Sequence, residues 1–327
     1  MFRLILAPME GLADYVLRDV LTAIGGFDQT VSEFIRVSGS LLPRRAFERL
    51  CPELKNAGHT PAGTPVVLQL LGSDPDWLAR NAQRAAAFSP HGIDLNFGCP
   101  AKLVNRHGGG AMLLAEPERL RHIVTTVRAA VPANVPVTAK MRLGLHDTTR
   151  TLECAQALAA GGAATLVVHA RTRDEGYRPP AHWEWIARIR EAVDIPVVAN
   201  GEVWTVADWQ RCRAVSGSRD VMLGRGAVAD PFLAQRIRGQ RNEQPTPEDW
   251  QELLPHILLW WHKVHDRVLP CHAPGRLKLL LSYWARTWPE AAALQAGLRR
   301  ITDPSAVADL LEAATKPQKR IAFTQLV

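Results

Sequence analysis

The segment Gly92–Pro100 reads GIDLNFGCP and carries the clearest fold signal in the chain. A mostly apolar run ends at Asn96, and Gly98 then lets the backbone turn sharply before Cys99. An apolar run of this length is typical of a strand that is buried on both faces of a parallel sheet. We therefore predict a strand over residues 92–96 with Cys99 in the loop at its carboxyl end.

Comparable β-rich runs recur along the chain, separated by longer amphipathic stretches rich in Ala, Leu and Arg. This alternation of strand and helix predicts a parallel sheet, and eight such units predict a closed (β/α)8 TIM barrel. The strands are expected at Leu4–Met9, Thr30–Ile35, Val66–Leu71, Gly92–Asn96, Val137–Leu143, Thr165–His169, Val197–Asn200 and Asp220–Leu223.

The pattern changes after about Gln240, where Gln244–Asp249 has the composition of a linker and a helix start. The remaining periodicity is helical. We predict an α/β fold with a C-terminal all-helical domain. The barrel domain is expected at residues 1–240, and the helical domain with its tail at residues 241–327.

Basic and aromatic residues are interleaved in the predicted helical domain, and the whole chain has a net charge of +7 with a pI near 9.5. This bias suits a polyanionic partner. We expect the tryptophans of this domain to form helix core rather than to stack on bases, namely Trp260, Trp261 and Trp284.

The five cysteines are widely spaced and odd in number, which favours a reducing cytoplasm over a disulfide framework. The apolar run at the N-terminus is too short for a signal peptide or a membrane span. We expect a cytoplasmic protein with no membrane partner. A zinc site is disfavoured because no paired-ligand motif connects the candidate ligands His256, His262, His265, Cys271 and His272.

Chemistry in such a barrel is expected where each strand ends. A free cysteine is usually a small buried hydrophobe, but Cys99 lies between Gly and Pro in a loop, which favours exposure to a substrate. The glycine-containing segments 200–202 and 224–226 follow the seventh and eighth strands, where barrels commonly bind phosphate. Either segment alone is equally consistent with a simple turn, but Lys140 and His169 on the preceding strands favour a phosphate-bearing cofactor.

A set of segments in this order resembles the tRNA-dihydrouridine synthases, and most closely their bacterial C-type enzymes. The resemblance covers nearly the whole chain. Phe97 departs from it, because a small or polar residue is common there, and we expect Phe97 to alter packing against the base. The segments are LAPMEG at 6–11, QLLG at 69–72, DLNFGCP at 94–100, GGGA at 108–111, KMRLG at 140–144, VHART at 168–172, ANGE at 199–202 and LGRG at 223–226.

The resemblance implies FMN at the barrel mouth and NADPH or NADH as a transient reductant, in keeping with the lack of a Gly-rich dinucleotide fingerprint after the first strand. It implies Cys99 as the catalytic residue. Independently of the resemblance, we expect a monomer by default. The implied cofactor-binding residues are Ala7, Pro8, Met9, Gln69, Lys140, His169, Asn200, Gly201, Glu202, Gly224 and Arg225. The expected tRNA contacts are Arg36, Asn96, Tyr177, Arg276, Lys278 and Arg299.

The implied reaction reduces the C5=C6 bond of uridine in tRNA, at position 16 of the D-loop. The reduced flavin delivers hydride to C6, and the mostly protonated thiol of Cys99 gives a proton to C5. Two alternatives stay open. An FMN barrel of this kind also suits a free pyrimidine, and a non-enzymatic RNA-binding barrel would hold no flavin.

Overall fold

The structure is a computed structural model that describes residues 1–106 and 108–315. It divides into two compact units, Met1–Glu243 and Gln244–Val327. The part of the predicted helical domain beyond residue 315 lies outside the described residues. No helix in the described ranges is long and apolar enough to cross a membrane.

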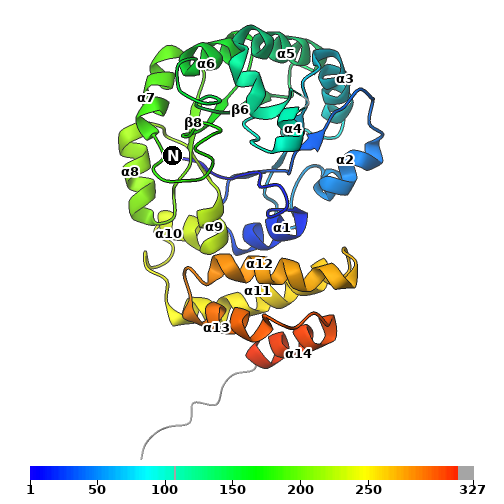
Figure 1. Cartoon of the computed structure of the whole chain (residues 1–327), viewed down its shortest axis with the longest axis vertical. Coiled ribbons are helices and arrows are strands. Elements are labelled where there is room, and N and C mark those ends of the chain that lie inside the picture. The colour runs from blue at the N-terminus through cyan, green and yellow to red at the C-terminus, as the bar shows by residue number, and fades with distance from the viewer. Residues whose placement is uncertain (107, 316–327) are drawn as a thin grey trace, which may run out of the picture. The chain divides into compact units, whose positions relative to one another are not determined.

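The first unit is a closed parallel barrel, as predicted, with its strands at the centre and helices around them (Figure 1). All neighbouring strands are parallel, and the ring closes because β2 pairs with both β1 and β4. The strands are β1 (Leu4–Leu6), β2 (Gln29–Val31), β3 (Ile35–Arg36), β4 (Val66–Leu71), β5 (Ile93–Phe97), β6 (Val137–Arg142), β7 (Leu166–His169), β8 (Val197–Asn200) and β9 (Val221–Leu223).

The second predicted strand, expected as one run, is two short strands along the same partner. Thr30 of β2 pairs with Val66, and Ile35 of β3 pairs with Leu70. Between them the Ser32 hydroxyl, rather than a backbone carbonyl, accepts the hydrogen bond from the Gln69 backbone N–H at 3.1 Å. The side chain thus replaces a ladder bond, and the backbone leaves the sheet there.

Helices between the strands cover the outside of the barrel. Asp74 caps α3 by accepting from the Trp77 backbone N–H, and Pro75 occupies the first turn, as that sequence predicted. The helices of this unit are α1 (Tyr15–Ile24), α2 (Arg44–Leu50), α3 (Pro75–Ala86), α4 (Lys102–Arg106), α5 (Pro117–Ala130), α6 (Thr151–Ala160), α7 (Trp183–Ala192), α8 (Val206–Ser216), α9 (Arg225–Ala229) and α10 (Leu233–Ile237), with 3-10 turns η1 (Pro52–Asn56) and η2 (Gly110–Ala115).

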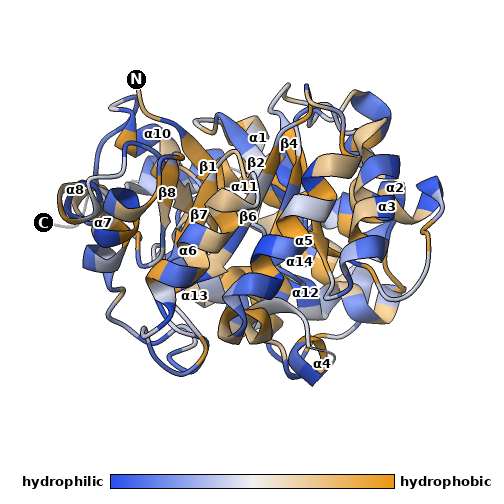
Figure 2. Cartoon of the chain, turned by 90° about the horizontal axis from the view of Figure 1, so that it is seen from above, coloured by the Kyte–Doolittle hydropathy of each residue, from blue (hydrophilic) through white to orange (hydrophobic). Residues whose placement is uncertain are grey.

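The inside of the barrel is built in layers. One layer is a buried apolar cluster, and the strands that supply it are among the most hydrophobic parts of the chain (Figure 2). Side chains two residues further along each strand lie on the same face and form the next layer toward the carboxyl ends. In this chain the residues of that layer are polar. The apolar cluster is Ile5, Ala7, Val31, Val67, Val167, Val198 and Met222. The polar layer includes Gln69, Asn96, Lys140, His169 and Asn200.

The second unit consists of the helices α11 (Pro247–His265), α12 (Ala273–Trp284), α13 (Pro289–Leu298) and α14 (Pro304–Thr315), with the 3-10 turn η3 (Pro270–His272). A capping box starts α11, because the Thr246 hydroxyl and the Asp249 carboxylate each accept the other residue's backbone N–H. Trp260, Trp261 and Trp284 are buried, which confirms that they form helix core.

Candidate active site

The loop after β5 is held from both sides at Cys99. The Asn96 side-chain oxygen Oδ1 accepts from the backbone N–H of Gly98 at 3.0 Å and of Cys99 at 2.9 Å. The Cys99 carbonyl oxygen accepts from Asn105 Nδ2 and from the Ala111 backbone N–H, both at 3.1 Å. Four hydrogen bonds therefore hold the backbone from which the thiol projects.

Cys99 is less open than its loop sequence indicated. Its exposed fraction is 8 %, and it packs with Leu71 and Val104, so the expectation of an exposed thiol is corrected. The physical reason is α4, which directly follows the loop and places Val104 against it. Burial raises the pKa of Cys99, opposed by Arg142 and Arg36 nearby. The thiol is thus protonated at neutral pH and is able to donate a proton.

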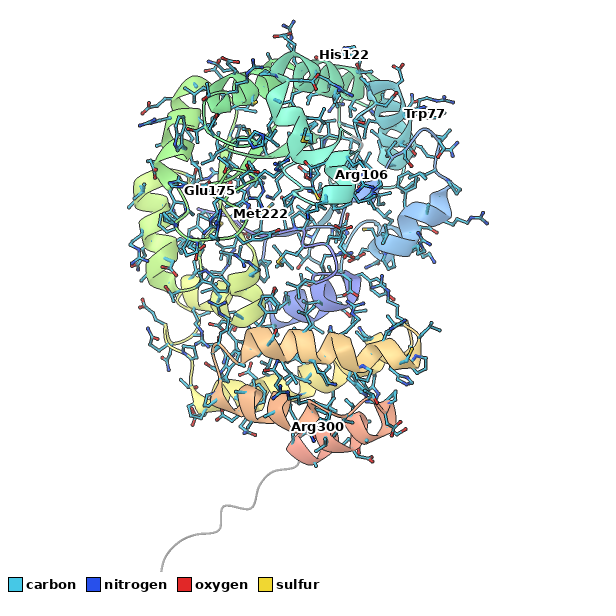
Figure 3. The ribbon with its side chains drawn as sticks, viewed as in Figure 1. Trp77, Arg106, His122, Glu175, Met222 and Arg300 are labelled. Carbon is cyan, nitrogen blue, oxygen red and sulfur yellow. The ribbon has the colours of Figure 1, made fainter. Side chains whose placement is uncertain are left out.

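Lys140 and Asn200 meet inside the barrel at the ends of β6 and β8. Lys140 Nζ donates to Asn200 Oδ1 at 3.1 Å, and Asn200 Nδ2 donates to the Met222 carbonyl at 2.9 Å. Figure 3 labels Met222, the β9 residue of the apolar layer below this pair. Burial and the neighbouring Arg142 lower the pKa of Lys140 to about 8.

Basic side chains gather around this lysine. His169, Arg142 and Arg171 are all buried at the carboxyl ends of β6 and β7. Burial, followed by Arg142, Lys140, Arg171 and Arg225, holds the pKa of His169 well below its usual range. The His169 imidazole is therefore neutral, whereas Lys140 and Arg142 carry like charges close together, which favours a bound anion beside them.

The loop between β7 and α7 is tied to the Cys99 loop through Arg142. Its guanidinium donates to the Gly98 carbonyl at 2.9 Å and to the carbonyls of Thr172 and Gly176 at 2.9 and 2.8 Å. This arrangement presents Tyr177, which is 53 % exposed, between Arg142 and Arg225. Glu175 of the same loop is labelled in Figure 3.

The turns after β8 and β9 adopt conformations that suit close approach to a ligand. Gly201 has φ +120° and Glu202 has φ +57°, values that residues other than glycine rarely adopt. The Glu202 carboxylate accepts from Arg171 and from Trp204 Nε1, so it is engaged with the protein. A Cβ added at Gly224 would meet nothing within 4 Å, which leaves open space beside Arg225.

These residues fit a phosphate-bearing flavin. Buried basic side chains lie beside a turn with open space at Gly224, and the phosphate of a flavin would supply an anion for them. Ala7, Pro8 and Met9 lie at the end of β1, directly beside β9 in the same ring. The predicted cofactor residues therefore meet at one end of one barrel.

Gln69 differs from its expected role in one respect. Its side chain is fully buried and is already engaged, donating to Asp94 and accepting from Asn96.

Phe97 is buried on the opposite face of β5 from Asn96, toward the helices. The expected packing of Phe97 against a base is therefore not supported, because strand alternation turns it away from the barrel interior.

The predicted tRNA residues fall in both units. Arg36 ends β3, Asn96 and Tyr177 lie at the site, and Arg276, Lys278 and Arg299 belong to the second unit. Lys278 Nζ donates to the carbonyls of Arg299 and Ile301 at 3.2 and 2.8 Å, which brings Lys278 and the Arg299 backbone together.

The sequence placed Arg142 and Arg171 at strand ends, where chemistry is expected, but gave them no role, and it did not select Asp94. The first two occupy strand ends, the position that already identified Lys140 and His169. Asp94 had its own signal, a charged residue between Ile93 and Leu95 in an apolar run.

Within residues 1–106 and 108–315, no group of three His, Cys, Asp or Glu side chains is placed to hold a metal ion.

The sequence matches the family described as Dihydrouridine synthase (Dus) over residues 5–316. It is 65 % identical over 322 residues to a tRNA-dihydrouridine(16) synthase of Cupriavidus necator, covering 97 % of this chain and 100 % of the relative. A protein of the same name from Pseudomonas putida is 55 % identical, over 94 % of this chain and 95 % of its own length.

Solved structures share the barrel at low sequence identity. An old yellow enzyme homologue of Zymomonas mobilis has a TM-score of 0.52 at 13 % identity and covers 76 % of this chain and 92 % of its own. A histamine dehydrogenase of Rhizobium sp. has a TM-score of 0.54 at 15 % identity, over 80 % of this chain and 48 % of its own. These likenesses concern the fold alone.

Proposed function

The chain belongs to the dihydrouridine synthase family, and from that premise we propose that it reduces uridine 16 in the D-loop of tRNA. It is a flavin-dependent oxidoreductase, and its substrate is tRNA. The flavin is FMN in this proposal, with NADPH or NADH as the visiting reductant. The observation that carries the proposal is the 65 % identity with a tRNA-dihydrouridine(16) synthase over 97 % of this chain and 100 % of the relative.

The bound flavin, once reduced, supplies a hydride to C6 of the uracil ring, whose C5=C6 bond is conjugated to the C4 carbonyl. The negative charge that then develops on C5 and O4 of the uracil requires a proton at C5. Cys99 is the donor in this proposal. Its raised pKa supports that role, because a thiol that stays protonated at neutral pH is able to act as a general acid.

The surrounding side chains hold the reactants rather than react. Lys140, with its ammonium in the polar layer, is proposed to bind the polar edge of the flavin ring. His169, Arg225 and the turn at Gly201 are proposed to hold its phosphate. Asn96 is proposed to orient the base, while its side-chain oxygen and nitrogen also keep their partners within the protein.

A uridine stacked in folded tRNA must turn outward to reach the thiol, and contacts elsewhere must offset that cost. We propose that Arg36 and Tyr177 of the first unit meet the RNA near the target base. The second unit is proposed to bind tRNA phosphates through Arg276, Lys278 and Arg299. These roles rest on the family resemblance.

The test is reoxidation of the flavin-loaded, NADPH-reduced protein under anaerobic conditions. Unmodified tRNA containing U16 is expected to reoxidise the flavin and to gain one dihydrouridine, whereas uridine monophosphate at the same concentration does neither. A matched tRNA with cytidine at position 16 is the control. Equal reoxidation by uridine monophosphate would favour the free-pyrimidine enzyme, and a purified protein without flavin would favour the RNA-binding barrel.

A further inference from the structure

Asp94 is a buried acid that the proposed reaction does not use. It lies on β5 two residues before Asn96, on the same face of the strand, and is 2 % exposed. Its two carboxylate oxygens accept hydrogen bonds from Gln69 Nε2 at 2.7 Å and from Thr138 Oγ1 at 2.6 Å. Burying a carboxyl group is costly, so its presence below the active site requires a reason.

A continuous chain of hydrogen bonds leads from Asp94 to the Cys99 loop. Gln69 donates to Asp94 through Nε2, and Gln69 Oε1 accepts from Asn96 Nδ2 at 2.8 Å. Asn96 Oδ1 in turn accepts from the backbone N–H groups of Gly98 and Cys99. Each side-chain amide in the chain therefore uses its oxygen on one side and its nitrogen on the other.

The two ends of the chain fix its direction. A backbone N–H only donates, so Asn96 must turn Oδ1 toward Cys99 and Nδ2 toward Gln69. Gln69 must then turn Oε1 toward Asn96, which leaves Nε2 in need of an acceptor. Asp94 is that acceptor. Without it, nothing at this end of the chain prevents Gln69 from rotating and facing Asn96 with a second donor.

We propose that Asp94 is a positioning residue that fixes the orientation of the Gln69 amide, which supports Asn96 and so holds the Cys99 loop for proton transfer. This inference rests on the proposed role of Cys99. Burial makes this chain of hydrogen bonds important, because Gln69 is fully buried and solvent cannot replace a missing partner.

A second role for Asp94 competes with this one. Its negative charge lies near Lys140 and favours the charged ammonium there. Two substitutions separate the roles. Asp94→Asn removes the charge but keeps an oxygen that accepts from Gln69, whereas Asp94→Leu removes both. Thr138→Val is the matched control, because it removes the other partner of Asp94 and leaves the chain to Cys99 intact.

The experiment compares these variants as flavin-loaded proteins that carry Cys271→Ser, since Cys271 is exposed. Alkylation of Cys99 by iodoacetamide is followed by peptide mass spectrometry, alongside kcat and KM for tRNA. We expect Asp94→Leu to raise the alkylation rate at least fivefold and to lower kcat at least tenfold, with KM within twofold. Asp94→Asn and Thr138→Val should stay within threefold of the parent in both rates.

Unchanged alkylation and kcat in Asp94→Leu would overturn the inference, and so would an Asp94→Asn variant as defective as Asp94→Leu, which would make the charge decisive. If Asp94→Leu does not fold, Gln69→Met breaks the same chain one step later and must give the same two changes. A parent protein that fails to reduce tRNA would refute the proposed function, while the alkylation rates would still decide the role of Asp94.

Discussion

Replacement of Gly110 by alanine tests how tightly the Cys99 loop is held. Gly110 has φ +59°, and an added Cβ would lie 2.8 Å from the Cys99 carbonyl oxygen and 2.9 Å from Val104 Cγ1. Alanine at such a φ costs about 1 kcal/mol. Overpacking against the loop adds about 1–3 kcal/mol. If this strain is about 2 kcal/mol larger in the transition state than in the bound ground state, kcat falls roughly 30-fold.

The matched control is Gly108→Ala in the same segment. Gly108 has φ +68°, but its added Cβ would meet nothing within 4 Å, so this variant bears only the backbone cost. Urea unfolding measures the stability of both variants, and single-turnover formation of dihydrouridine measures activity. Gly110→Ala with the same activity as Gly108→Ala would show that the position of the Cys99 loop does not limit the reaction.

Three further outcomes follow from buried titratable groups. Turnover should stay flat through neutral pH and fall only above about 8.5, the ordinary thiol pKa, because burial raises the pKa of Cys99 and a general acid must be protonated; a fall centred below pH 7 in the single-turnover profile would contradict this. Flavin binding to flavin-free protein, followed by fluorescence quenching, should weaken as pH rises through about 8, where Lys140 loses its charge, and Lys140→Met should abolish that pH step. Arg18→Met leaves the Glu53 carboxylate buried without its cation and should lower the free energy of unfolding by about 3–5 kcal/mol, most of which Arg18→Met/Glu53→Met should recover in urea titrations.

The barrel was predictable because its strands are local apolar runs with clear ends. Val66–Leu71 and Val197–Asn200 agree with the structure at both ends. The run Thr30–Ile35 did not reveal its break, since the break depends on a hydrogen bond between Ser32 and Gln69, which are distant in sequence. Such a contact has no periodic signal.

The site was predictable where chemistry follows strand ends, as at Lys140 and His169. Burial at the site was not. Cys99 was expected to be exposed, but α4 packs Val104 against it. The role of Asp94 depends on which atoms of three side chains face one another, and neither composition nor spacing records that.

The most direct test of the central claim is the dihydrouridine content of each D-loop position in tRNA from cells that lack this protein. The cells are complemented with the native chain or with Cys99→Ala, and tRNA is read by site-resolved mass spectrometry. Dihydrouridine should be lost at position 16 alone, and the native chain but not Cys99→Ala should restore it. Unchanged tRNA in the deficient cells, or full restoration by Cys99→Ala, would contradict the account.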